Sequence, residues 1–275
     1  MNGPAPIASE APPPTRPCPL CGGGGAQDLP RYSREGWRVA RCAGCGFVRL
    51  ANPPGHAALE EDFAWEKGLD AEKARRLKAA PAMYGLDYAT RFRTGLFQRT
   101  DMEKYVRWFG AGGNVLDVGC ASGGRITEPF TPYGIEVSKA LAAEADADMR
   151  ARGGRCVQGP GAEAIRAFGP ELFDGIVMRS YLEHEERPMQ VLEGARRALK
   201  PTGAVYVKVP NWGSVNRRVT GGRWCGVRLP DHVNYFTAAS LTAMAAEAGF
   251  DLGIVNPINL PFDDNIHALL RRRAN

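Results

Sequence analysis

The stretch VLDVGCASGGRI, residues 115–126, carries the strongest local pattern in this sequence. An apolar run that contains Asp117 is followed by Gly119, Gly123 and Gly124, which predicts a strand, a tight turn and the start of a helix. Glycine adopts positive φ freely and lets a backbone approach a ligand closely. On its own, such a loop is only a weak indication of a nucleotide-type site.

The next apolar run, YGIEVS, ends near a second acid, Glu136, which stands 19 residues after Asp117. A carboxylate at that place can accept hydrogen bonds from both ribose hydroxyls of an adenosine. The spacing from Gly119 to Gly123 lacks the G-x-G-x-x-G register of dinucleotide binders, and no Lys-Ser or Lys-Thr pair follows the glycines. The acids and the spacing therefore distinguish this loop from a dinucleotide-binding loop and from a phosphate-binding P-loop.

Further along the chain, short apolar runs alternate with helical stretches. The runs RCVQG, FDGIVMRS and GAVYVKVPN follow in order. Continuous apolar strands that alternate with helices indicate a parallel sheet covered on both faces. The last two runs, DLGIVNPIN and NIHALLRRR, predict two strands joined by a proline-containing turn, with the final strand antiparallel at or near an edge.

The runs VLDVGCASG, GIEVS, FDGIVMRSYLEH and ALKPTGAVYVKVPN, in this order, resemble the motifs of class I S-adenosylmethionine-dependent methyltransferases. The segment DHVNYFTAASLTAMAAEAGF, residues 231–250, is similar to the C-terminal segment of the small-molecule branch, which includes ubiquinone-type and natural-product enzymes. The resemblance covers about residues 112–272. It implies an α/β, Rossmann-like, seven-stranded and mostly parallel sheet of order 3-2-1-4-5-7-6, with the cofactor at the carboxyl ends of the strands.

The resemblance also implies which residues contact S-adenosylmethionine. Asp117 and Gly119 would lie near its methionine part, and Glu136 would hold the ribose. The loop after the third strand would pack by the adenine through Ala162 and Glu163, although an Asp that relatives often carry there is absent. Ala121 stands where many relatives have glycine, which is the mildest change possible. The full expected set is Asp117, Gly119, Cys120, Ala121, Gly123, Glu136, Ala162, Glu163 and Arg179.

The methyl group of the cofactor is already activated, so the protein chiefly has to align it with the acceptor. A hydroxyl acceptor also needs a base that removes its proton. Histidine is the usual base near neutral pH, and the chain has His56, His184, His232 and His267. His184 follows the fourth strand, where similar methyltransferases often carry an E-H pair whose histidine in some is the base. Alternatively, His184 and Glu183 brace the rim of the site. His232, in an insertion after the fifth strand, is the second candidate base.

The insertion at residues 211–236 is rich in aromatic and basic residues. Together these residues could clamp a phosphorylated or carboxylated acceptor, form a lid with a charged outer face, or stack single-stranded nucleic acid. The set comprises Trp212, Arg217, Arg218, Arg223, Trp224, Arg228, Tyr235 and Phe236.

Two C-x-x-C pairs, Cys18 with Cys21 and Cys42 with Cys45, are separated by 20 residues. This spacing is typical of a zinc ribbon, whose four thiolates close the site and make the metal structural. A thioredoxin-like redox pair would stand at a helix start after a strand, which is not the setting here; an iron centre is the other alternative. Metal binding would supply folding free energy that this glycine-rich segment lacks.

The chain is thus expected to comprise a disordered tail (1–17), a zinc ribbon (18–50), a helical linker that helps cover the acceptor (51–110) and an S-adenosylmethionine-binding domain (111–275). No apolar run reaches the length of a membrane span, and none resembles a secretory signal, so we expect no membrane partner and a cytoplasmic location. The net charge of +5 permits nucleic-acid binding without indicating it.

These observations predict a methyltransferase that acts on a small molecule, with O-methylation of a nucleotide-linked sugar or a natural-product intermediate as the expected reaction. One alternative is an enzyme that modifies RNA or protein and docks its substrate through the zinc ribbon. A second alternative is a non-catalytic cofactor-binding protein. The sequence does not indicate an oligomeric state.

Overall fold

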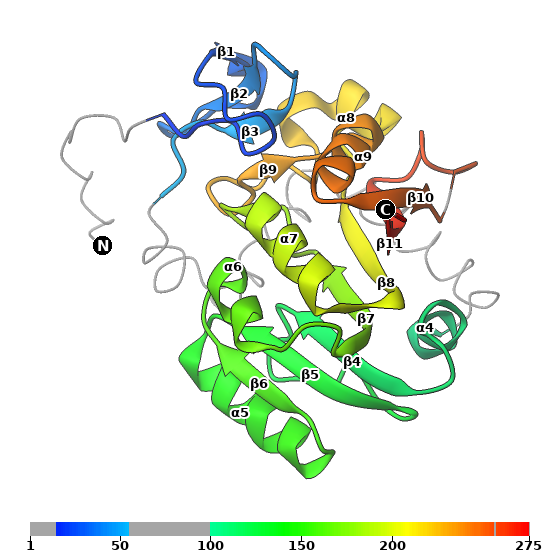
Figure 1. Cartoon of the computed structure of the whole chain (residues 1–275). Helices are drawn as coiled ribbons and strands as arrows, with labels where there is room; N and C mark the ends of the chain where they lie inside the picture. Colours follow the sequence, from blue (N-terminus) through cyan, green and yellow to red (C-terminus); the bar gives the residue numbers. More distant parts are fainter. Residues whose placement is uncertain (1–14, 55–99, 256, 275) are drawn as a thin grey trace.

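The computed structural model describes residues 15–54, 100–255 and 257–274 (Figure 1). Most of the expected tail and most of the expected helical linker therefore lie outside the described residues. The described end of that linker is helical, because α4 spans Asp101–Phe109. Its first turn is closed by a capping box between Thr100 and Glu103, which satisfies backbone N–H groups that no helical carbonyl can reach.

The larger sheet of the described residues has seven strands in the order β10-β11-β8-β7-β4-β5-β6. Every neighbouring pair is parallel except those of β11, which runs antiparallel to both β8 and β10. Read from β6, this is the predicted order 3-2-1-4-5-7-6, which is confirmed. The strands are β4 Gly113–Val118, β5 Phe130–Glu136, β6 Arg155–Gln158, β7 Phe173–Arg179, β8 Leu199–Pro210, β10 Phe250–Ile254 and β11 Asn265–Arg272.

Helices cover both faces of this sheet because successive strand residues point to opposite sides. Leu116 and Ile176 face the core that contains α7 (Pro188–Ala198) and α9 (Ala238–Glu247), whereas Val115 and Val177 face the aromatic side chains of α4. Among the described residues, none of the helices has both the length and the apolar character for crossing a bilayer. The remaining helical segments are η1 Pro30–Tyr32, α5 Lys139–Ala151, α6 Gly161–Ala164, η2 Ile165–Ala167, α8 Val215–Thr220 and η3 Gly221–Arg223.

The helix predicted directly after the glycine loop is absent, so that prediction was wrong. Strands β4 and β5 are joined by residues 119–129, which form turns without a helix. Gly123 and Gly124 both have positive φ, +88° and +81°, which a right-handed helix does not allow. The connection is also shorter than the dozen or more residues that a helical crossover usually takes. Instead, the buried side chain of Ile126 anchors the loop against the α4 face of the sheet.

A second, antiparallel sheet holds the cysteine-bearing segment and has the order β1-β2-β3-β9. Its first three strands are β1 Ala26–Asp28, β2 Val39–Cys42 and β3 Val48–Leu50. The fourth, β9 (Asn234–Tyr235), comes from the insertion that follows β8, and it pairs Asn234 with Arg49 and Tyr235 with Val48. The small sheet lies at one end of the molecule (Figure 1). The larger domain contributes its fourth strand, β9.

The aromatic residues of the insertion are buried under this small sheet. Trp212 contacts the ring of Tyr32 at a centroid distance of 4.6 Å and that of Tyr235 at 5.0 Å. We call this group the interface cluster. Its buried members are Tyr32, Val39, Val48, Leu50, Trp212, Trp224, Val227, Val233 and Tyr235.

Candidate functional site

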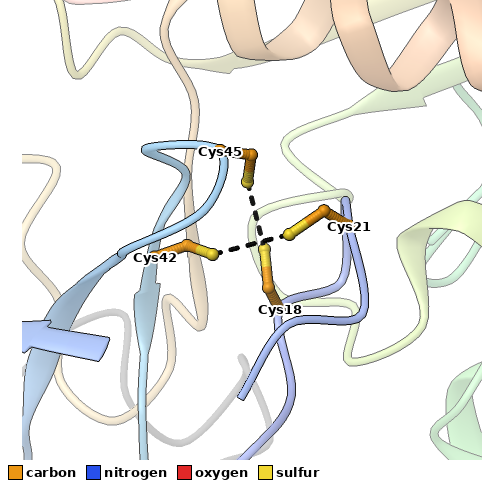
Figure 2. A group of neighbouring side chains, drawn as sticks. All are labelled: Cys18, Cys21, Cys42 and Cys45. Carbon is orange, nitrogen blue, oxygen red and sulfur yellow. Dashed lines mark hydrogen bonds between the residues drawn. The ribbon is translucent and has the colours of Figure 1, made fainter. Parts of the chain in front are cut away.

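The four paired cysteines converge on one point (Figure 2). Their Sγ atoms all lie within 4.8 Å of one another, and the distances from Cys18 to Cys45 and from Cys21 to Cys42 are both 3.5 Å. A tetrahedral zinc ion with Zn–S bonds of about 2.3 Å would separate its sulfur ligands by about 3.8 Å. The cluster therefore fits a four-thiolate zinc site with little rearrangement.

Both cysteine pairs adopt the same turn. The backbone N–H of Gly22 donates to the carbonyl of Cys18 at 2.8 Å, and that of Gly46 donates to Cys42 at 3.0 Å. The two glycines have φ of +71° and +76°, a region that residues with a Cβ enter at a cost. The glycine after each pair is thus required by the turn that directs the thiolates inward.

The glycine loop and Glu136 meet at the carboxyl ends of β4 and β5. Glu136 is buried, and its Oε2 accepts a hydrogen bond from the backbone N–H of Ala121 at 2.8 Å. Its Oε1 accepts one from the N–H of Ser138 at 3.0 Å. These bonds hold the carboxylate at the mouth of the loop, where it can also accept hydrogen bonds from a diol.

Asp117 lies on the α4 face of β4 and is buried. Both of its oxygens accept hydrogen bonds from Nη1 of Arg125, at 2.7 and 2.8 Å. Burial raises the pKa of Asp117 to about 6, against the opposing effect of Arg125. Arg125 thus ties the carboxylate to the loop that replaces the expected helix.

The structure distributes the other predicted cofactor residues around this loop. Ala162 is buried in α6, and Glu163 forms an ion pair with Arg187. Cys120 is buried, with its Sγ 3.7 Å from that of Cys156. Gly119 and Gly123 have positive φ. Arg179, by contrast, forms an ion pair with Asp101 of α4.

Tyr181, which is not among the predicted site residues, fills the space between the loops that carry Gly119 and Gly161. A Cβ on Gly119 would lie 2.9 Å from its ring. Its hydroxyl accepts a hydrogen bond from the N–H of Gly161 at 3.1 Å and donates one to Glu185 at 2.5 Å. In the sequence, the feature that points to Tyr181 is its position directly after β7, at the carboxyl edge of the sheet.

The two candidate histidines lie together, although 48 residues separate them in the sequence. The rings of His184 and His232 are 4.7 Å apart between centroids and nearly perpendicular. A carboxylate oxygen of Glu183 and one ring nitrogen of each histidine lie within 4.8 Å of one another. Nδ1 of His184 is 2.9 Å from Oδ1 of Asp231, and Nδ1 of His232 is 2.9 Å from the carbonyl of Gly226.

Burial and charge set opposite proton affinities for the two rings. Burial lowers the pKa of His184, but the carboxylates of Asp231 and Glu183 outweigh it and the net pKa is raised. Burial and the neighbouring charge of His184 hold the pKa of His232 well below its usual value. Burial raises the pKa of Glu183 to about 7. His232 is therefore neutral near pH 7, and His184 is the more basic ring.

The remaining candidates have structural roles or lie elsewhere. The guanidinium of Arg217 lies over the rings of Tyr32 and Trp212 and donates hydrogen bonds to both residues at 2.8 Å. His267 lies in β11, where its Nδ1 is 2.8 Å from the hydroxyl of Tyr206. His56 lies outside the described residues.

The mostly parallel sheet and the helices on its two faces define a Rossmann-like α/β fold. A model of a methyltransferase domain matches residues 88–253, more than half of the chain. The chain therefore belongs to the methyltransferases and is an S-adenosylmethionine-dependent enzyme. No curated protein matches it.

Solved structures share this fold at low sequence identity. A methyltransferase from Archaeoglobus fulgidus is 15% identical, with a TM-score of 0.50 over 62% of this chain and 91% of that chain. The YcgJ protein from Bacillus subtilis is also 15% identical, with a TM-score of 0.46 over 60% and 94%. A possible histamine N-methyltransferase from Thermotoga maritima is 16% identical, with a TM-score of 0.43 over 63% and 95%. At 15% identity, the likeness to the Archaeoglobus fulgidus structure concerns the fold alone.

Proposed function

We propose that this enzyme methylates an oxygen of a small-molecule acceptor, a nucleotide-linked sugar or a natural-product intermediate, with His184 as the general base. The observation that carries the proposal is the pair formed by His184, in the loop that follows β7, and Asp231, in the insertion that follows β8. The ring of His184 also lies beside that of His232. An imidazole held by a carboxylate is a common arrangement for removing a proton from a hydroxyl.

Bound S-adenosylmethionine supplies the activated methyl group. Glu136 holds the ribose hydroxyls, because its buried carboxylate is fixed at the mouth of the loop. The backbone from Gly119 to Gly123 admits the methionine part, and Asp117 lies behind it. Ala162 and Glu163 line the adenine side of the cofactor site. Arg179 contributes to this site indirectly, through its ion pair with Asp101 of α4.

His184 would take the acceptor's hydroxyl proton on its free ring nitrogen. The bound cofactor would supply the methyl group to the acceptor oxygen, with the S–CH3 bond breaking and the electron pair staying on the sulfur of the S-adenosylhomocysteine that leaves. Asp231 fixes the ring through Nδ1 and stabilises the imidazolium that forms. His232 keeps its Nδ1 engaged with the carbonyl of Gly226, so its other nitrogen is free to accept a hydrogen bond from the acceptor. The four thiolates of Cys18, Cys21, Cys42 and Cys45 bind a structural zinc ion that takes no part in this step.

The buried interface cluster favours a small acceptor over a docked RNA. Stacking of bases needs exposed aromatic faces, whereas Trp212, Trp224 and Tyr235 are each at most 3% exposed. The insertion thus uses its aromatic residues to attach the small sheet.

The test is a methyl-transfer screen with labelled cofactor against sugar nucleotides, small phenols and total RNA. Transfer to a small hydroxyl compound is expected, and transfer to RNA alone would overturn the proposal. With the acceptor in hand, His184→Ala should lower kcat by about 10²- to 10⁴-fold, and unchanged turnover would exclude the base. The spacing of Glu183, His184 and His232 would also admit a metal ion. Activity lost on mild chelation and restored by a divalent ion other than zinc would therefore contradict the base assignment.

A further inference from the structure

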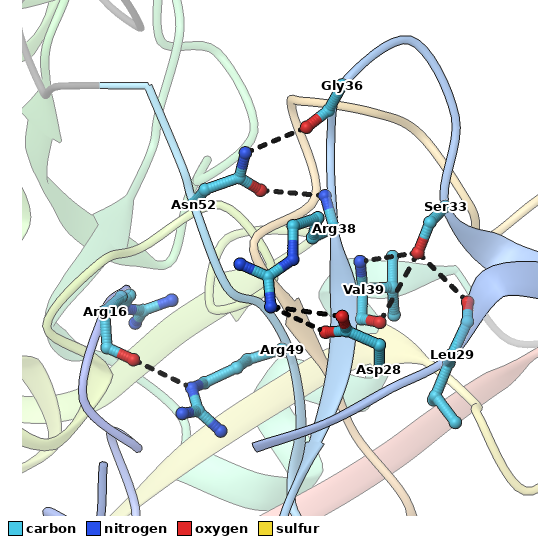
Figure 3. Close-up of polar contacts among 9 residues, drawn as sticks. All are labelled: Arg16, Asp28, Leu29, Ser33, Gly36, Arg38, Val39, Arg49 and Asn52. Carbon is cyan, nitrogen blue, oxygen red and sulfur yellow. Dashed lines mark hydrogen bonds and ion pairs between the residues drawn. The ribbon is translucent and has the colours of Figure 1, made fainter. Parts of the chain in front are cut away.

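Arg49, in the middle of β3, is a completely buried arginine with 0% of its surface exposed. Its Nε donates a hydrogen bond to the carbonyl of Arg16 at 3.0 Å (Figure 3). Its Nη1 and Nη2 are buried, and within the described part of the chain neither has a hydrogen-bond partner. A buried guanidinium whose two Nη groups have no partner is strongly disfavoured unless an anion joins it.

The neighbouring charges do not supply that anion. Arg16 lies beside Arg49, and the two positive charges oppose each other. The guanidinium of Arg16 is already engaged, since it donates to the side chain of Asn234 and to the carbonyls of Val233 and Glu186. Glu186 and Glu185, the acids that act on Arg16, form no hydrogen bond to Nη1 or Nη2 of Arg49 in the described residues.

The carboxylate of the adjacent loop is also committed. Glu185 accepts hydrogen bonds from the hydroxyl of Tyr181 at 2.5 Å and from the backbone N–H of Arg187 at 2.8 Å. Neither of its oxygens bonds to Arg49 in the described residues. Among the described residues, no carboxylate therefore hydrogen-bonds to Nη1 or Nη2 of Arg49.

Arg49 is linked through Asn234 to the loop that carries His184. It pairs across the sheet with Asn234, two residues after His232. The side chain of Asn234 donates to the carbonyls of Leu182 and Glu185 at 2.7 Å each. The backbone of Asn234 and Val233 donates to the carbonyl of Glu183. One short ladder therefore joins Arg49 to the loop that carries His184.

We propose that the guanidinium of Arg49 is the anion-binding group of the acceptor site, and that the acceptor carries a phosphate or a carboxylate. The inference rests on the proposed function, because it adds a substrate class to the same site. Two Nη donors in a planar fork match two oxygens of either anion. Two arginines of the insertion fit this role less well, since Arg217 is engaged with aromatic rings and Arg228 with Asp231.

The first test measures the thermal midpoint of unfolding of the zinc-loaded protein with bound S-adenosylhomocysteine. The midpoint is measured in inorganic phosphate, pyrophosphate, acetate or citrate and compared with the midpoint in chloride at equal ionic strength. The wild type should gain at least about 3 °C at saturating anion by mass action, and the anion that acts distinguishes phosphate from carboxylate recognition. Arg49→Met should lose this shift. Arg41→Gln, at an exposed position of the same small sheet, is the matched control and should keep it. An equal shift in wild type and Arg49→Met, or no shift in the wild type, would overturn the proposal.

The second test separates an anion-binding role from a structural one. An arginine kept unpaired for a ligand destabilises the anion-free protein, so Arg49→Met should melt at or above the wild-type temperature in chloride. An arginine that only holds the fold would give a lower midpoint, which would overturn the proposal. His184→Ala should lose turnover but keep the anion-dependent shift. The experiments therefore distinguish a wrong assignment of the base from a wrong assignment of the anion site.

Discussion

At the scale of single residues, the glycine loop contains a residue whose backbone conformation disfavours its side chain. Ala121 has φ of +50°, in the left-handed region that costs a non-glycine residue about 1–2 kcal/mol. This position donates the N–H that orients Glu136. The loop therefore accepts strain in order to present its backbone to that carboxylate.

We predict that Ala121→Gly leaves the free energy of unfolding unchanged or raises it by up to about 1 kcal/mol, because the relieved strain offsets the entropy that glycine adds to the unfolded chain. The matched control is Ala143→Gly, on the exposed side of α5, which should cost about 1 kcal/mol. Urea denaturation of both variants measures the difference. Equal losses would show that Ala121 is not strained.

The pair of His184 and Asp231 predicts a pH dependence. The carboxylate raises the pKa of His184, and a base must be neutral to accept a proton, so kcat/KM should rise with pH through that pKa and then level off. Asp231→Asn removes the raising charge and should move the ascending limb to lower pH while lowering the plateau. The measurement is a pH profile of both proteins.

The control for this profile is Asp148→Asn, which removes a surface carboxylate paired with Arg152 on α5 and should leave the limb in place. If Asp231→Asn kept the wild-type limb and only lowered stability, His184 would be a brace of the rim.

At the scale of elements, the strands were predictable and one helix was not. Apolar runs such as those of β4 and β7 are continuous because both of their faces are buried, and this pattern survives in sequence. The turn after β4 also follows from its glycines. Whether the chain then enters a helix depends on the positive φ of Gly123 and Gly124 and on tertiary contacts, since Arg125 bonds to the buried Asp117 and Ile126 packs into the core under α4. No local pattern encodes such contacts.

Strand β9 is only two residues long, and its role depends on one side chain. The amide of Asn234 donates to two carbonyls of the loop after β7 and accepts from Arg16. Asn234→Ala would leave two buried carbonyls without donors, so we expect a loss of about 2–3 kcal/mol in the free energy of unfolding. Asn216→Ala, which removes a half-buried bond to Asp264, should cost less than about 1 kcal/mol. Equal costs in urea denaturation would show that β9 does not join the small sheet to the site.

At the scale of the whole molecule, the sequence predicted a site at the carboxyl ends of the strands but could not show which distant residues meet there. The motif order located Glu136 and the glycine loop, since the carboxyl ends of parallel strands share one edge. It could not show that His184 and His232 touch, because the path of residues 211–236 is set by packing under the small sheet. The sequence also carries no signal for the contacts of Asp231 and Arg49, since Asp231 meets His184 and Arg49 pairs with Asn234 only once that insertion contributes β9.

The cysteine cluster is continuous with this assembly. Cys18, Cys42 and Phe47 belong to the same buried core as the α7 and α9 face of the large sheet, and the ring of Phe47 lies 5.4 Å from that of Phe236. A zinc site built into a shared core should contribute to the stability of the whole chain. The glycine loop and Glu136, in contrast, lie on β4 and β5, which have no pairing with the small sheet.

Zinc removal should therefore separate cofactor binding from acceptor turnover. We expect a strong chelator, or Cys45→Ser, to lower the thermal midpoint by about 5 °C or more, since each lost kcal/mol costs about 2–4 °C in a chain of this size. Methyl transfer should be lost, because Arg49 and the His184 loop are held by β3 and β9, while calorimetric binding of S-adenosylhomocysteine should persist. Cys225→Ser, at a cysteine outside the cluster, should retain metal and turnover. If chelation left both the midpoint and turnover unchanged, the small sheet would be independent of the catalytic domain. If it abolished cofactor binding as well, the zinc site would support the whole sheet and not the acceptor side alone.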